Sequence, residues 1–537
     1  MKKKNTGDRI AWTVVIAAII AVSLIRFRLL GMPLERDEGE YAYMAQLLLK
    51  GIPPYLGAYS MKFPGIYAAY AGIIALFGHT IEGIRAGLIL VNTANILLLF
   101  LLARRLIGTY GGVVAAAFYA FSSLDPNFFG LSANAEHFVT LPVLAGSLVL
   151  LKAFESGRNR LFLLSGLFFG AAVVVKQHGI FFGTFGFLYL LWHEHKIGNA
   201  AYADIAKRAA SFAAGAALPL AITCAMLSAA GAFDKFWFWV VSYGSGYVNC
   251  LPSKTGFAEL AKKISKIALS PAMPIYFIAL AGVFPLFTRS VKKYAAVFIF
   301  GLLAASFLST AQGFYFRGHY FLFILPALSI LAGVAVSSLK GFLPCLLAVS
   351  ALVYFAYGNA DVFFRKTPVQ VTRVMYGNNP FPESVAIAEH IRSTAGKNYS
   401  IAVLGSEPQI YFYLDRQAST KYAYMYPLLE PQPFFLAMQV EVVRDITAAA
   451  PDYIVFVNAI SSWTEYGSFA ETGKHMFGWI DSYLSKKYYV IGVIDIINGE
   501  PTVYRWGDPL AGYVPSSNCH IAVFKRRKAV SDTLPAH

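Results

Sequence analysis

The sequence predicts an α-helical polytopic membrane protein that ends in an extracytoplasmic α/β domain. The chain is 57% hydrophobic and only 14% charged, whereas soluble globular proteins carry about 25% charged residues. Long apolar runs fill the first two thirds of the chain, and the composition changes after about residue 360. We therefore expect a transmembrane domain over residues 1–360 and an extracytoplasmic α/β domain over residues 361–537.

The apolar runs predict about eleven membrane spans, since one span needs about 20 apolar residues. The predicted spans are 10–31, 83–103, 110–127, 135–153, 160–175, 178–193, 208–231, 270–288, 293–311, 319–338 and 340–357. The start Met1-Lys2-Lys3-Lys4 resembles a signal peptide, but no small-residue cleavage site follows it. The first run is therefore predicted to be a span with its N-terminus inside.

The run 64–77 is too short to be a clear span, and the distribution of charge decides how it is interpreted. If it crossed the membrane, every later loop would change sides. Without a crossing, most basic clusters lie on the cytoplasmic side, as the positive-inside rule requires. These clusters are Arg104-Arg105, 152–160, 193–208, 289–293 and Lys340. Only Lys262, Lys263 and Lys266 come out external, so 64–77 is predicted to be an interfacial helix on the outer face.

An odd number of spans places the C-terminal third outside as well. Helical and strand-like segments alternate there, which is typical of a small α/β domain. The predicted helices are 385–392 and 434–448, and the predicted strands are 401–405, 453–457, 488–496 and 520–525. In the membrane region, the aromatic stretch 232–247 is expected to form an interfacial belt helix.

Net charge and cysteine content favour neither nucleic-acid binding nor a metal site. The net charge of +16 lies largely in clusters at the ends of apolar runs, where the positive-inside rule places it, so no nucleic-acid partner is expected. The four cysteines Cys224, Cys250, Cys345 and Cys519 are scattered, without CxxC pairs or metal-ligand spacing.

The first external loop, Pro33 to Phe63, contains a dense charged run. It can be a solvated loop that ends the first span. Its next segment, Tyr41 to Leu49, is amphipathic at helical spacing and would lie along the membrane surface, with Asp37 and Glu38 at its N-terminus. An aspartate there can take a proton from an acceptor hydroxyl. The chain then turns back toward Lys62, a compact cation that can bind phosphate.

Other ionisable residues are predicted on the same outer side. Each alone can be a group at a helix end that reaches for water, but ionisable residues at membrane depth are functional hypotheses by default. Together they provide carboxylates for proton abstraction and cations for an anionic leaving group. They are Arg85, Asp125, Glu136, Lys176, His178, Arg317 and His319, with Tyr320 beside them.

The strings Arg36–Ala42 and Lys62–Gly65 resemble the GT-C superfamily of integral-membrane glycosyltransferases. The similarity is to the branch of dolichyl-phosphate-mannose protein mannosyltransferases, the lipid A aminoarabinose transferase and bacterial lipopolysaccharide sugar transferases. It extends to about residue 330. Further similar segments are 83–86, 102–106, 134–136, 176–179 and 317–321. The segment 406–413 resembles stretches after the bundle in bacterial relatives, or is a simple strand-to-helix junction.

The resemblance implies a GT-C-like bundle that transfers a sugar from a polyprenyl-phosphate donor to an envelope acceptor. The reaction would be inverting and take place at the outer face of the cytoplasmic membrane. The family's catalytic aspartate falls on Asp37 and its phosphate-contacting lysine on Lys62. Its second acidic position, often aspartate in relatives, falls on Glu136, which is therefore expected to be catalytic together with Asp37. Arg317 and His319 are candidates for phosphate contacts. Relatives in this branch generally lack an essential metal, so no cofactor is expected, although the oligosaccharyltransferase branch uses one.

The remaining candidate residues are predicted to bind substrate. They are Glu38, Arg85, Asp125, Lys176, His178 and Tyr320. A transporter or flippase of lipid-linked glycans is the alternative, although the charged residues gather at one face and no paired broken spans are visible. An inactive scaffold is a third possibility. The sequence identifies neither the sugar nor the acceptor, which can be a lipid, a polysaccharide or a protein.

Overall fold

A computed structural model describes the whole chain except residues 1, 199, 249–252, 289, 465–470 and 528–537. Cys250 and Arg289, which enter the predictions above, lie outside the described residues. The chain forms two compact units. Unit 1 comprises Met1–Met32 and Met61–Val371, and unit 2 comprises Pro33–Ser60 and Thr372–His537. The expected transmembrane domain included 33–60, whereas the structure groups this segment with the C-terminal residues.

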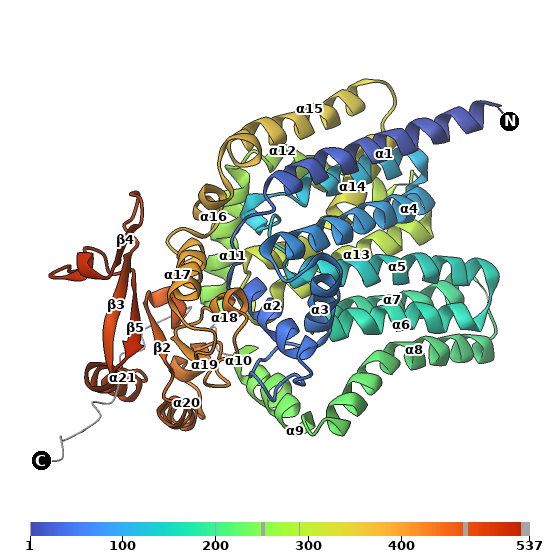
Figure 1. Cartoon of the computed structure of the whole chain (residues 1–537). Coiled ribbons are helices and arrows are strands. Elements are labelled where there is room, and N and C mark those ends of the chain that lie inside the picture. The colour runs from blue at the N-terminus through green and yellow to red at the C-terminus, as the bar shows by residue number, and fades with distance from the viewer. Residues whose placement is uncertain (1, 199, 249–252, 289, 465–470, 528–537) are drawn as a thin grey trace, which may run out of the picture. The chain divides into compact units, whose positions relative to one another are not determined.

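Unit 1 is helical throughout (Figure 1). Its helices are α1 (Lys2–Arg28), α3 (Gly65–Phe77), α4 (Ile81–Ser122), α5 (Ala135–Ser156), α6 (Asn159–Val175), α7 (Gly179–Lys196), α8 (Tyr202–Ala229), α9 (Phe233–Phe236), α10 (Gly244–Val248), α11 (Ser253–Ala268), α12 (Met273–Ala281), α13 (Lys293–Ala311), α14 (Leu325–Ser338) and α15 (Leu343–Gly358). α16 (Pro368–Tyr376) continues from unit 1 into unit 2. Short 3-10 and π-helical segments join several of them.

Six helices in the described part of the chain are long and apolar enough to cross a membrane. They begin at Thr6, Ile81, Ala135, Tyr202, Lys293 and Gly318, and a seventh arises if α11 and Met273–Phe287, bent by 105°, count as one span. Each predicted span coincides with a helix or a helix extended by a 3-10 segment. The 17 residues of α6, however, extend only about 26 Å, against a hydrocarbon core of about 30 Å. The chain is a multi-pass membrane protein, and the count of eleven stays a prediction.

One end of unit 1, called the basic end below, carries Arg–carboxylate pairs. They connect the start of α1 and the end of α5 to the middle of α4, and the end of α7 to the start of α8. The pairs are Arg104–Asp8, Arg105–Glu155 and Arg208–Glu194. Segments predicted to share the cytoplasmic side therefore lie together, as the charge distribution requires.

The helix α4 runs from the opposite end to the basic end and back. Near its start, Arg85 donates to the carbonyl of Leu131, and the residue that follows α4, Ser123, accepts from Arg26. The helix breaks at Gly108, where φ is 85°, a backbone conformation that glycine adopts without a Cβ clash. The predicted spans 83–103 and 110–127 are the two arms of α4.

The short helix α3 begins and ends at the end opposite the basic end. A Cβ atom on Gly65 would lie 2.4 Å from the carbonyl oxygen of Val174, at the end of α6, and one on Gly83 would lie 2.5 Å from that of Gly78. The 13 residues of α3 extend only about 20 Å. α3 therefore does not connect the two ends, in line with the predicted absence of a crossing. Its location at the membrane interface stays a prediction.

Small residues hold α6 in place. A Cβ atom on Gly166 would lie 2.0 Å from the carbonyl oxygen of Phe212, and one on Gly215 would lie 2.0 Å from that of Leu163, so α6 and α8 pack backbone to backbone. The hydroxyl of Ser165 donates to the carbonyl of Gly146 on α5 at 2.9 Å. Membrane helices pack closely through such residues, and this packing fixes the end of α6 that carries Lys176.

Unit 2 is an α/β unit with a five-stranded sheet in the order β1-β2-β5-β3-β4. The strands are β1 (Ile401–Leu404), β2 (Tyr453–Asn458), β3 (Tyr488–Asp495), β4 (Val503–Trp506) and β5 (His520–Arg526), and the helices are α2 (Arg36–Leu49), α17 (Phe381–Thr394), α18 (Gln409–Leu414), α19 (Tyr426–Leu429), α20 (Phe435–Ala449) and α21 (Lys474–Lys487). β1 pairs with β2 in parallel, and the other pairings are antiparallel. The predicted strands and helices are confirmed, while β4, α19 and α21 were missed.

The helix α2 corrects one expectation. It was predicted to be amphipathic and to lie along the membrane surface, but all residues from Arg36 to Leu47 are buried. On α18, Gln409 lies so close to Gly39 that a Cβ there would be 2.7 Å away. The Tyr43 ring lies 5.2 Å from that of Tyr411. The polar face of α2 is covered by protein, and so the helix is part of unit 2.

Candidate functional site

The first turn of α2 holds the acids predicted to be functional. Glu35 caps the helix: its carboxylate accepts from the backbone N–H of Glu38 at 3.0 Å, while the backbone N–H of Glu35 donates to the Glu38 carboxylate at 3.1 Å. This reciprocal capping box fixes the helix start. Glu38 was predicted to bind substrate, but it is fully buried and takes part in the capping box. Asp37 is 7% exposed, and the N-terminal end of the helix stabilises its ionised carboxylate.

Arg36 anchors this turn within unit 2. Its guanidinium pairs with Glu407 at 2.7 Å and donates to the carbonyl of Ser406 at 2.6 Å and to the Tyr426 hydroxyl at 3.1 Å. Glu407 is fully buried and also accepts from Ser462 at 3.0 Å. Sequence reasoning assigned no catalytic residue to the C-terminal domain. The resemblance of segment 406–413 was the one signal that pointed to Glu407.

Asp37 lies near the buried side chain of Tyr424. Burial raises the pKa of Tyr424 well above its usual value, and the nearby Tyr426 and Asp37 raise it further. Tyr424 therefore keeps its proton at neutral pH. Its hydroxyl is a neutral group beside the carboxylate and not a competing anion.

Glu407→Gln is expected to destabilise unit 2, because it leaves the buried guanidinium of Arg36 without a counter-charge. Breaking a buried pair in this way typically costs about 3–5 kcal/mol. Limited proteolysis and thermal unfolding of the purified protein measure the loss, and cleavage is expected to appear within 33–60. Glu471→Gln is the matched control, because the ion pair of Glu471 with Lys474 is exposed. Equal protease resistance of the two variants would contradict the anchoring role.

In unit 1, the structure brings Glu136 and Lys176 together. Glu136 lies in the first turn of α5 and Lys176 directly follows α6. Their side chains form an ion pair of 2.5 Å and are 0% and 8% exposed. The Lys176 ammonium also lies 4.7 Å from the centre of the Tyr320 ring, a cation–π distance. A buried cation is thus held between a carboxylate and an aromatic face.

His178 lies beside this pair. Its ring is 4.8 Å from the ring of Tyr320, and the His319 ring lies 4.8 Å from Tyr320 as well. Burial, and then the positive charges of Lys176, His319 and Arg317, lower the pKa of His178 well below its usual value. The imidazole is therefore neutral at pH 7.

Neither ring nitrogen of His178 has a hydrogen-bond partner among the described residues, although both are buried. Such groups are rare in folded proteins and call for an explanation, such as an absent ligand or water. A neutral imidazole offers one donor and one acceptor. We call Glu136, Lys176, His178, Arg317, His319 and Tyr320 the polar cluster. Its members come from the ends of α5, α6 and α7 and from the segment before α14.

The backbone of Lys62 lies next to the polar cluster. The preceding residue, Met61, accepts a hydrogen bond of 2.6 Å from the Gln177 side chain, and Gly65 touches the end of α6. Lys62 itself is partly exposed. The structure thus brings the predicted phosphate-binding lysine to the turn that carries Lys176 and His178.

Arg85 and Asp125 were also predicted to bind substrate, but their described contacts hold a loop. Arg85 donates to the carbonyls of Leu131 and Met32, each at 3.3 Å. Asp125 accepts from the Tyr276 hydroxyl at 3.0 Å and from backbone Asn127 at 2.9 Å. Burial raises the pKa of Asp125. Both residues shape the loop that leads to Glu136.

Sequence reasoning missed Arg26, which supports the same loop. Its guanidinium donates to the carbonyls of Gly130 at 2.9 Å and Ser123 at 2.8 Å. The signal was present, because Arg26 is an arginine inside a predicted span and such residues are functional hypotheses by default. Within the described ranges, no three His, Cys, Asp or Glu side chains gather as a metal site, so no ligand set can be named.

The fold places the chain in a structural class. It is similar to that of ArnT from Cupriavidus metallidurans bound to undecaprenyl phosphate, with a TM-score of 0.58 and 15% identity over 96% of this chain and 98% of that one. The apo structure of ArnT from the same organism has a TM-score of 0.51 and 17% identity, over 83% of this chain and 93% of that one. The oligosaccharyltransferase of Archaeoglobus fulgidus was solved tethered to an acceptor peptide containing the NVT sequon. It has a TM-score of 0.50 and 11% identity, over 92% of this chain and 74% of that one.

The sequence points to the same class. Residues 62–202 match the family model described as dolichyl-phosphate-mannose-protein mannosyltransferase. No curated protein sequence matches the chain. The matched residues include Lys62, Glu136, Lys176 and His178. The predicted resemblance to GT-C superfamily membrane glycosyltransferases is confirmed by the family model for residues 62–202, and the fold is similar to that of ArnT over 96% of the chain.

Proposed function

We propose that the protein is a glycosyltransferase that moves a sugar from a polyprenyl-phosphate donor to an envelope acceptor at the outer face of the cytoplasmic membrane. The polar cluster carries this proposal. Lys176 and Arg317 are the strongly basic residues there, and His178 offers two unpartnered nitrogens in a buried setting. A lipid phosphate is an anion that suits this combination. The similar ArnT structure was solved with undecaprenyl phosphate, which is itself a lipid phosphate.

The cations would act on the leaving group. As the bond between the anomeric carbon and the phosphate oxygen breaks, negative charge grows on the phosphate, and fixed cations stabilise it more than they stabilise the intact donor. Lys62 and Lys176 act as point charges, while Arg317 can bind two phosphate oxygens at once. Glu136 was expected to be catalytic. Its ion pair with Lys176 favours a positioning role, in which it holds the ammonium in place.

Asp37 is proposed as the general base. It accepts the proton of the acceptor hydroxyl while that oxygen forms a bond to the anomeric carbon from the face opposite the phosphate. The phosphate leaves with the bonding electron pair, and the configuration is inverted. Support comes from the capping box, which fixes the helix turn that carries Asp37.

The test is a reconstitution with one donor. Purified protein in liposomes is given labelled polyprenyl-phosphate sugar and an envelope extract, and the products are read by mass spectrometry. We expect one new glycosidic bond for each polyprenyl phosphate released. Movement of the labelled donor between leaflets without a new glycosidic bond would contradict the proposal and favour a flippase.

A further inference from the structure

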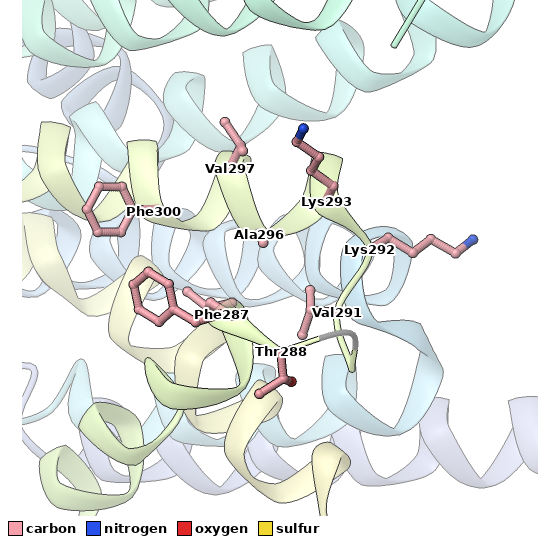
Figure 2. A pocket seen from close by; sticks show the side chains of 9 residues that line it. Phe287, Thr288, Val291, Lys292, Lys293, Ala296, Val297 and Phe300 are labelled. Atoms are coloured by element: carbon pink, nitrogen blue, oxygen red, sulfur yellow. The ribbon is translucent and has the colours of Figure 1, made fainter. Parts of the chain in front are cut away.

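A second candidate site lies at the basic end of unit 1. A crevice of about 590 Å³ opens between the 3-10 segment Phe284–Phe287 and the start of α13. Figure 2 shows Phe287 and Phe300 at one end of it and Lys292 and Lys293 toward the other. The two phenylalanines are 78% and 55% exposed. The crevice therefore combines an open apolar wall with a cationic rim.

The two lysines have no carboxylate partner in the described part of the chain. In this they differ from Arg104, Arg105 and Arg208 at the same end, each of which forms an ion pair with a carboxylate of unit 1. The hydroxyl of Thr288 at the rim is engaged, because it donates locally to the Pro285 carbonyl at 2.9 Å. Lys292 also lies 6.0 Å from the centre of the Tyr294 ring, a contact that leaves its charge uncompensated. The polar chemistry of the crevice is thus that of two ammonium groups.

The crevice is distinct from the polar cluster. Lys293 begins α13 and Arg317 follows its other end, and the 19 residues of the helix extend about 28 Å. That is close to the thickness of a hydrocarbon core. Phe300 lies two turns beyond Lys293, about 10 Å further along the helix. In a membrane that α13 crosses, this spacing places the cationic rim at headgroup depth and the aromatic wall at acyl-chain depth.

We infer that this crevice binds an anionic phospholipid. Its phosphate lies against Lys292 and Lys293, and an acyl chain lies along Phe287 and Phe300. The open apolar wall suits a lipid chain, and the paired cations select a headgroup with net negative charge over a zwitterionic one. The site is independent of the sugar donor, because it lies at the other end of α13.

Native mass spectrometry of the protein released from nanodiscs that contain equal amounts of phosphatidylglycerol and phosphatidylcholine tests this. We expect the wild-type protein to retain phosphatidylglycerol preferentially. Each lysine near a membrane surface contributes about fivefold to the affinity for anionic lipid, so K292Q/K293Q is expected to lower the preference by roughly 25-fold. Lys340→Gln, which removes another exposed lysine outside the crevice, should leave it unchanged.

A second variant separates the apolar wall from the charge. Ala296 lines the crevice, and Ala296→Phe fills it without altering any charge, so retention of both lipids should fall. Equal retention of the two lipids by the wild-type protein would overturn the inference. An unchanged preference in K292Q/K293Q, or displacement of the bound phosphatidylglycerol by an equimolar amount of phosphatidylcholine, would overturn it as well.

Discussion

Asp37→Asn is expected to lower kcat for sugar transfer by about 10²–10⁴-fold, the usual contribution of a general base. The amide has nearly the same size as the carboxylate but cannot accept the proton of an acceptor hydroxyl. The helix start should persist, because Glu35 and Glu38 form the capping box. Single-turnover transfer with labelled donor measures the chemical step, and a donor-binding titration is expected to give an unchanged Kd.

Asp415→Asn is the matched control for Asp37→Asn. Asp415 also belongs to unit 2, but its side chain is 60% exposed and pairs with Lys50 at the surface. We expect its transfer rate to equal that of the wild-type protein. Full transfer by Asp37→Asn would remove Asp37 from the chemistry, and a weakened Kd with unchanged kcat would make it a binding residue.

Lys176→Met is expected to cause two separate losses. The buried Glu136 carboxylate loses its counter-ion, and removing one partner of a buried pair typically costs about 3–5 kcal/mol in free energy of unfolding. The donor phosphate loses a cation, so the Kd for polyprenyl phosphate should rise and kcat should fall. Thermal unfolding in detergent reports the first loss, and a titration with polyprenyl phosphate reports the second.

The double variant K176M/E136Q distinguishes structure from function. It removes both charges, so much of the stability lost in Lys176→Met is expected to return. Donor binding and transfer should stay low, because the cation is still absent. If the double variant recovered transfer together with stability, Lys176 would be a structural residue only.

The structure brings together, in the polar cluster, residues that the sequence had assigned to one side, and the reason is physical. Glu136, Lys176 and Arg317 each lie at the end of an apolar run, and the positive-inside rule assigned all three ends to one side. Helices of similar length bring such ends together, because they cross the same apolar layer. The pairing of Glu136 with Lys176 was not predictable, since no local pattern specifies which side chains meet.

The location of α2 could not be predicted either. An amphipathic pattern shows that one face avoids water, but it does not show whether protein or lipid covers that face. The deciding contact joins Arg36 and Glu407, which are 371 residues apart in the sequence. The short strand β4 was missed because its four residues include the exposed Tyr504 and Arg505 and carry no apolar alternation.

The predicted span 270–288 illustrates a third difference. Its apolar run is continuous in sequence, but α12 ends at Ala281. The chain continues as a 3-10 segment that contains Pro285, and proline lacks the N–H that a continuing helix needs. This interruption creates the wall of the lipid crevice, which hydropathy alone does not reveal.

Cross-linking of residue 37 to residue 317 is the most direct test of the central claim that the base and the phosphate-binding cations serve one reaction. Cysteines are introduced at both positions after Cys224, Cys250, Cys345 and Cys519 are replaced by serine, and native membranes are treated with a short bifunctional maleimide. We predict a cross-link that polyprenyl phosphate suppresses. A cysteine pair at positions 50 and 415, whose native side chains lie 2.6 Å apart, verifies the reagent. If that pair cross-links and 37–317 does not, the proposed reaction is contradicted.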